Sequence, residues 1–157
     1  GRPLFSKKEA VPFEPYVVPF GKSRVLKSGK DITIIAVSFM VPEAVKAASE
    51  LEKRGISAEV IDLLSASPLD MKTICGSAGK TGRLIVVDTD WANCGISAEI
   101  SAGVNEALFG KLKVPVKRAT VPFSPAPTAC GMETSYYPDY RTIAGACVRM
   151  VRQARNR

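Results

Sequence analysis

Histidine is absent from this sequence of 157 residues. The chain therefore lacks the side chain most often used for proton transfer near neutral pH, which is also the commonest metal ligand. A hydrolase that depends on its own histidine is excluded. The sequence also has no apolar run of the roughly 18 to 20 residues that span a bilayer and no continuous apolar secretory signal at its start. We expect no membrane partner.

Closely spaced cysteine pairs are missing as well, because the four cysteines stand at positions 75, 94, 130 and 147. Structural zinc sites and redox-active pairs need shorter intervals, such as C-x-x-C. In a chain with enough apolar residues for a core, we expect free and mostly buried thiols. A reducing compartment fits this best, which means the cytoplasm, or the mitochondrial matrix or plastid of a eukaryote.

Acidic residues are fewer than basic ones, and the formal net charge is +7 at pH 7. Such a surface can attract phosphates or acidic partners. However, the lysines and arginines lie in separate groups at 22–30, 111–118 and 149–157. Single-strand nucleic-acid binders instead use one basic stripe with interleaved aromatic residues. We therefore expect no nucleic-acid partner.

What the sequence does contain is a repeated alternation of apolar strands and amphipathic helices. Residues 1–22 carry four prolines and no periodicity, so they read as an extended arm before a domain at 23–157. The expected strands are 25–26, 31–39, 57–63, 84–87 and 114–122, and the expected helices are 41–55, 69–78, 96–112 and 139–157. This order predicts an α/β fold with a mainly parallel sheet and helices on both faces.

The segment DTDWANCGISAE at 88–99 is the best placed candidate site. It runs from the carboxyl end of a strand to the amino end of a helix, where ligands bind in open α/β sheets. Side chains that could converge there are Asp88, Asp90, Asn93 and Cys94. The pattern leaves two readings open, a site for a small anionic ligand and a loop buried at a subunit interface. No base is available to activate a cysteine nucleophile.

Trp91, the single tryptophan, lies in the same predicted loop and could either contact a subunit or cover the edge of the sheet. Ser97 is the expected N-cap of the following helix, as Asp70 is for the helix near 69–78. GSAGKTG at 76–82 does not match a phosphate loop, since position 74 is Ile and the segment ends a helix.

Three segments, in this order and spacing, resemble one family: IDLLSASPLD at 61–70, TGRLIVVDTDWANCGISAEI at 81–100 and VPFSPAPTACGMETSYYPD at 121–139. They look like the carboxyl-terminal domain of the beta subunit of thiamine-diphosphate-dependent 2-oxoacid dehydrogenases, of the pyruvate, branched-chain and acetoin type. The resemblance implies a three-layer α/β/α domain of the transketolase type with a mixed, five-stranded sheet.

The same resemblance implies an enzyme whose thiamine diphosphate, magnesium and catalytic residues all lie outside this chain. That enzyme would decarboxylate a 2-oxoacid and pass the acyl group to a lipoyl group. This domain's share would be assembly with an alpha subunit, a second beta subunit and, in some members, the lipoyl acyltransferase core. Related alternatives are the equivalent domain of a transketolase, a deoxyxylulose phosphate synthase or a 2-oxoacid:ferredoxin oxidoreductase. A free-standing anionic-ligand-binding module is an alternative of another class.

The proline-rich stretch 121–139 reads as a stiff connection from the last strand to the last helix, because proline fixes φ. Family members usually have a Leu-Glu pair where Met132 and Glu133 stand here. Tyrosines combine apolar area with a polar tip, which suits subunit contacts. The predicted interface residues are Trp91, Asn93, Cys94, Glu133, Tyr136 and Tyr137.

Overall fold

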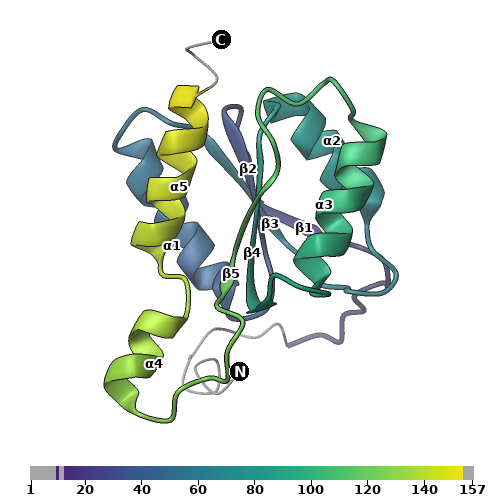
Figure 1. Ribbon diagram of the computed structural model, residues 1–157. Helices are drawn as coiled ribbons and strands as arrows, with labels where there is room; N and C mark the ends of the chain where they lie inside the picture. The colour runs from purple at the N-terminus through teal and green to yellow at the C-terminus, as the bar shows by residue number, and fades with distance from the viewer. Residues whose placement is uncertain (1–9, 11–12, 154–157) are drawn as a thin grey trace.

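The computed structural model describes residue 10 and residues 13–153, which form a sheet between two layers of helices (Figure 1). Most of the first half of the predicted arm and residues 154–157 of the last predicted helix lie outside the described residues. The elements are β1 Arg24–Lys27, β2 Ile32–Ala36, α1 Met40–Glu52, β3 Ala58–Asp62, α2 Met71–Thr81, β4 Leu84–Trp91, α3 Ile96–Ala107, β5 Lys117–Val121, α4 Cys130–Tyr136 and α5 Tyr140–Gln153.

The sheet has five strands in the order β1-β3-β2-β4-β5. The strands β2, β3, β4 and β5 pair in parallel, and β1 joins β3 antiparallel at one edge. All residues of β2 and β3 are buried, as expected for strands that helices cover on both faces. The predicted mixed, mainly parallel, five-stranded sheet is confirmed.

Alternate residues of the strands face opposite layers. Ile34 and Val60 are register partners and belong to the core under α1 and α5. Their neighbours Ile35 and Ile61 belong to the second core, under α2 and α3. Each of these fully buried side chains contributes roughly 1.5 to 3 kcal/mol of burial free energy. The predicted three-layer α/β/α architecture follows from this alternation.

Capping residues decide where two of the helices begin. The carboxylate of Asp70 accepts a hydrogen bond from Thr73 N–H at 3.2 Å, which confirms its predicted role as the N-cap of α2. The prediction for Ser97 is wrong, because the N-cap of α3 is Gly95 and Ser97 is fully buried. A Cβ on Gly95 would lie only 2.4 Å from Trp91 O, so the chain passes too close there for any side chain.

The proline-rich stretch is not only a connection. Residues Cys130–Tyr136 within it form the short helix α4, which projects below the rest of the domain in Figure 1. The sequence hides this helix because prolines flank it and its N-cap residue makes no side-chain hydrogen bond. Tertiary contacts, described below, hold it in place.

A buried polar network lies near the amino ends of the strands. Glu59 on β3 accepts hydrogen bonds from Ser77 and Lys80 of α2. The hydroxyl of Thr33 on β2 is 2.8 Å from Ser77 Oγ and 2.9 Å from Thr81 Oγ1. Polar groups buried in this way stabilise a fold only when they are hydrogen-bonded, and each of these five side chains is. The network fixes α2 against the sheet.

Three thiols of the described chain are free: Cys75 is half-buried, Cys94 is exposed and Cys147 is buried. Burial raises the pKa of Cys147 to about 12, so this thiol stays protonated. The expectation of mostly buried thiols fails at Cys94. Among the described residues, no helix combines the length and the apolar character that crossing a membrane requires.

Candidate subunit interface

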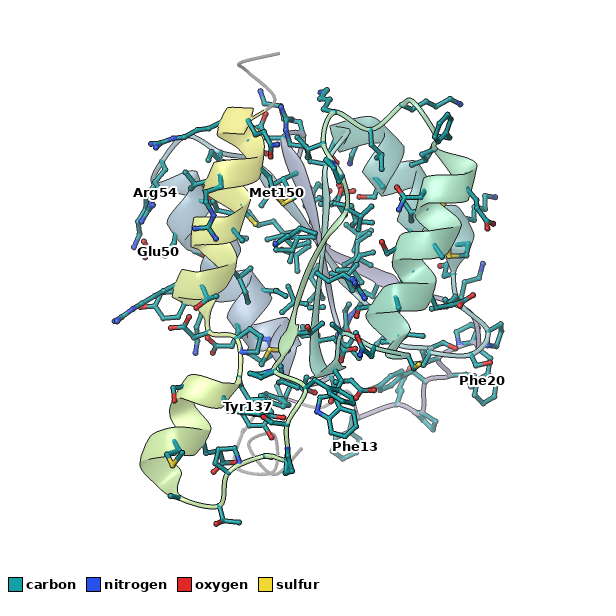
Figure 2. The ribbon with its side chains drawn as sticks, viewed as in Figure 1. Phe13, Phe20, Glu50, Arg54, Tyr137 and Met150 are labelled. Atoms are coloured by element: carbon teal, nitrogen blue, oxygen red, sulfur yellow. The ribbon has the colours of Figure 1, made fainter. Side chains whose placement is uncertain are left out.

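Aromatic residues gather where the parallel strands end. Phe39 follows β2, Trp91 ends β4 and Phe123 follows β5. Because parallel strands end at the same edge of a sheet, these residues come to one side of the domain. The helix α4 brings two tyrosines to the same place, and Figure 2 labels one of them at this end. The aromatic cluster consists of Phe39, Trp91, Phe123, Tyr136 and Tyr137.

The sequence had suggested that Trp91 lies in a loop, but it is the last residue of β4. It pairs with Val121 of β5 across a break in the register. Its ring packs edge to face against Phe123, with 4.8 Å between the ring centroids. The indole N–H donates a hydrogen bond to Ser124 O at 3.2 Å. The side chain is nevertheless 40% exposed.

The two tyrosines are half-buried and pack on each other, with ring centroids 5.2 Å apart. Tyr137, the residue after α4, also meets Phe39, the residue before α1, edge to face with 5.3 Å between the ring centroids. The hydroxyl of Tyr136 donates to Ser124 O and lies 3.3 Å from Pro122 O. These contacts fix α4 onto the segment that follows β5.

One carbonyl joins the two halves of the aromatic cluster. Ser124 O accepts hydrogen bonds from both Trp91 and Tyr136, which come from β4 and α4. This arrangement holds the rings in fixed positions while much of their surface stays in water: Phe123, for example, is 70% exposed. Exposed rings with hydrogen-bonded polar tips are typical of protein interfaces.

The described part of the arm adds apolar surface near this end. Figure 2 labels Phe13 and Phe20 at the same end of the molecule as Tyr137. Residues 14–18 contain no helix or strand. The exposed large apolar residues of the arm are Phe13, Tyr16, Val17, Val18 and Phe20. Contiguous apolar surface of this kind marks interaction sites more often than it covers a monomer.

The remaining predicted interface residues take no part in the ring contacts. Asn93 and Cys94 occupy the exposed loop between β4 and α3, where Cys94 has a positive φ of 57°. Arg118 of β5 donates to Ala92 O at 2.6 Å and so ties this loop to the sheet. Glu133 is exposed on α4. The structure thus brings Trp91, Tyr136 and Tyr137 together but leaves Asn93, Cys94 and Glu133 as separate surface positions.

Asp88 is a buried carboxylate of this end, only 3% exposed. Its Oδ1 accepts hydrogen bonds from Thr89 N–H at 2.7 Å and Asp90 N–H at 3.3 Å, while Oδ2 has no partner among the described residues. Burial raises the pKa of Asp88, and the nearby Asp90 adds to this effect. Asp90 itself is exposed and accepts from Trp91 N–H. These two carboxylates disfavour an anionic ligand.

The described residues contain no group of three or more histidine, cysteine, aspartate or glutamate side chains that could hold a metal ion.

Sequence reasoning missed Phe39 and Phe123 as members of the aromatic cluster. Phe39 ends one predicted strand and Phe123 follows another, so the parallel topology alone would have brought both to the edge where Trp91 lies. Their position relative to α4 could not be anticipated, since α4 itself was not predicted.

The model of the transketolase C-terminal domain family matches residues 21–143, which is more than half of the chain. The chain belongs to this family. Its carboxyl-edge aromatic cluster lies within the matched residues.

Two of the similar proteins are named as beta subunits. The chain is 40% identical over 143 residues to the beta subunit of acetoin:2,6-dichlorophenolindophenol oxidoreductase of Cupriavidus necator, covering 91% of this chain and 42% of that subunit. It is 42% identical over 142 residues to the mitochondrial pyruvate dehydrogenase E1 component subunit beta of Ascaris suum, covering 90% of this chain and 38% of that subunit. The chain thus spans about two fifths of these relatives, and the predicted resemblance to such beta subunits is confirmed.

A solved structure supports the fold. The chain resembles a split-gene transketolase, described as an inactive beta4 tetramer, with a TM-score of 0.73 and 28% identity. The similarity covers 90% of this chain and 45% of that one. The transketolase-type fold is therefore shared with a protein that forms an oligomer.

Proposed function

We propose that this chain is the assembly and partner-docking domain of the beta subunit of a 2-oxoacid dehydrogenase. The observation that carries the proposal is the aromatic cluster, a rigid and partly exposed set of rings at the carboxyl edge of the sheet. The relatives are named as beta subunits and a tetramer, which supports a role in assembly. The partners would be an alpha subunit, a second beta subunit and the lipoyl acyltransferase core.

The reaction itself belongs to the assembly and not to this chain. The full enzyme would decarboxylate a 2-oxoacid with thiamine diphosphate and magnesium, and would pass the acyl group to lipoyl. This chain's own residues would position subunits and exclude water from their contacts. The compartment stays a prediction, namely the cytoplasm, or the mitochondrial matrix or plastid of a eukaryote. The boundary between the arm and the domain, between residues 22 and 23, also stays a prediction.

A chimeric subunit tests the proposal. In it, this chain replaces the matching stretch of the beta subunit of the Cupriavidus necator acetoin oxidoreductase, and the chimera is co-expressed with that enzyme's other subunit. We expect co-purification and activity with the chimera, and no activity with the 157-residue chain alone. Decarboxylation of a 2-oxoacid by the chain alone, or failure of a folded chimera to co-purify, would contradict the proposal.

The same chimera tests the aromatic cluster directly. Trp91→Ala removes a partly exposed ring of the kind that dominates interface energetics, so we expect subunit affinity to fall about tenfold or more. Leu26→Ala is the control, because Leu26 is a 37% exposed apolar side chain on β1, at the opposite edge of the sheet from β5. It should change affinity less than about twofold. Thermal unfolding of each variant separates loss of folding from loss of contact.

A further inference from the structure

The amino ends of the parallel strands form the edge opposite the aromatic cluster. Backbone hydrogen bonds join their flanking segments in a row: Lys30 N–H donates to Ser57 O at 3.2 Å, before β2 and β3. Lys113 N–H donates to Gly82 O at 2.8 Å, ahead of β4 and β5. The residues around these starts therefore share one surface of the domain.

The helices end at this surface, since each runs antiparallel to the strands that it covers (Figure 1). Figure 2 labels Arg54 after α1 and Met150 on α5 toward one end of the molecule, with Tyr137 and Phe13 at the other. The exposed basic residues here, named the basic end, are Lys30, Lys53, Arg54, Lys80, Lys111, Lys113, Lys117, Arg149 and Arg152.

Acidic side chains neutralise only part of the basic end. Two of its lysines, Lys53 and Lys80, form salt bridges with Glu50 and Glu59. None of the salt bridges among the described residues involves Lys111 or Lys117. These two lysines therefore leave positive charge on this surface, where it would attract an acidic partner.

Helix dipoles explain only part of this charge. Basic side chains in the last turn of a helix are stabilised by the dipole, which accounts for Lys80 and Arg152. Lys111 and Lys117 are different, since they lie in the connection after α3 and at the first position of β5. Neither position needs a cation for local structure.

An exposed ring lies beside these lysines. Phe109 is 90% exposed and is followed by Gly110, whose φ of 72° turns the chain into Lys111. A large apolar side chain left in water amid cations offers an apolar contact together with charge attraction. Such a surface fits a partner segment that carries both carboxylates and an apolar residue.

We propose that the basic end binds an acidic segment of a partner protein, with Phe109 as its apolar contact. A nucleic acid fits less well, because single-strand binders stack successive bases on several aromatics along one groove. Here one exposed ring accompanies cations from the ends of separate elements on both faces of the sheet. The basic end is remote from the aromatic cluster, so this binding and the assembly role can fail independently.

Binding of acidic peptides to the full 157-residue chain tests the proposal. The probes are fluorescently labelled poly-L-glutamate and a glutamate-rich peptide with one leucine, followed by anisotropy at low ionic strength. The double variant Lys111→Gln with Lys117→Gln should bind both probes about tenfold more weakly than wild type. The control variant, Lys22→Gln with Lys72→Gln, loses the same two positive charges, but at the opposite end of the domain. It should change affinity for either probe less than about twofold.

The exposed ring has its own readout. Phe109→Ala should weaken binding of the leucine-containing peptide several-fold and leave binding of poly-L-glutamate unchanged. Phe20 is an exposed ring of the arm, and Phe20→Ala should change binding of neither probe. Equal weakening by the two lysine pairs would show that net charge alone matters and would overturn the proposal. Tighter binding of a single-stranded oligonucleotide, dependent on Lys111 and Lys117, would overturn it in favour of a nucleic acid.

Discussion

Two buried carboxylates, one at each end of the sheet, are held in opposite ways. At the amino end, the carboxylate of Glu59 is hydrogen-bonded by Ser77 and Lys80. At the carboxyl end, Oδ2 of Asp88 is buried without a partner among the described residues. Positive φ angles in residues other than glycine, which store strain, also occur only at the carboxyl end within the described chain. The end with the aromatic cluster thus carries a carboxylate and backbone angles that cost stability.

The largest expected effect comes from removing the satisfied carboxylate. Glu59→Ala removes the acceptor of three hydrogen bonds, from Ser77, Lys80 and Gly29 N–H, so the free energy of unfolding should fall by about 2–3 kcal/mol. Denaturant unfolding at neutral pH measures this. Glu52→Ala breaks the exposed pair with Lys27 and should cost less than about 1 kcal/mol. Equal losses in the two variants would mean that the buried hydrogen bonds of Glu59 contribute no more than an exposed ion pair.

Acid should abolish the contribution of Glu59. Burial alone would raise its pKa, but hydrogen bonds from Lys80, Ser77 and Gly29 N–H outweigh burial and leave the pKa below its ordinary 4.5. A lowered pKa in the folded state gives stability that is present above pH 4.5 and is lost as the pH falls through the folded pKa. The difference between wild type and Glu59→Ala should therefore narrow in acid.

At the carboxyl end, the charged carboxylate of Asp88 lowers stability, whereas that of Glu59 raises it. The pKa of Asp88 is raised by burial, so its charged form costs stability at neutral pH, a cost that disappears below its ordinary pKa of 3.8. Asp88→Asn keeps an oxygen for Thr89 N–H and removes the charge. The free energy of unfolding should rise at pH 7 and match wild type at low pH, as urea unfolding at both pH values would measure.

Asp90→Asn is the control for this substitution, since Asp90 is exposed on the same strand. Its effect should stay within about 0.5 kcal/mol at all pH values. A destabilised Asp88→Asn protein at pH 7 would mean that the unpartnered oxygen is stabilising after all.

The smallest effect should come from relieving strain in the loop before α3. Cys94→Gly removes the side chain at a φ of 57°, which glycine adopts freely, and should raise the free energy of unfolding by about 0.5 kcal/mol. Asn93→Gly, one residue earlier and without a positive φ, should lower it by a similar amount. Thermal unfolding distinguishes the two, and a loss in both variants would argue against strain at Cys94.

Much of the fold could be predicted from local patterns. The apolar run at 31–39 predicted β2, and the periodicity of Val41, Val45, Ala48 and Leu51 predicted α1. α2 begins after its N-cap Asp70 and ends before Gly82, which has a left-handed conformation. Both residue types are recognisable in a sequence as helix signals. The boundaries were less accurate, because α2 continues to Thr81, where hydrogen bonds to β2 hold its last turn.

The candidate interface was predicted only in part. Trp91, Tyr136 and Tyr137 were chosen for their residue type and indeed lie together. Their partners Phe39 and Phe123 were not anticipated, nor was the helix that carries the tyrosines. Nothing in a single segment shows that Ser124 O will accept two hydrogen bonds from distant elements.

By itself, the sequence determined the alternation of strands and helices and the parallel sheet covered on both faces, which follow from periodicity and from residues that act on their immediate neighbours. The family came from the resemblance of three segments, at 61–70, 81–100 and 121–139. Tertiary structure alone decided that α4 forms, that Ser97 is buried instead of capping, and that the charges and the rings lie at opposite ends. These outcomes depend on contacts between segments far apart in the chain, which no local pattern encodes.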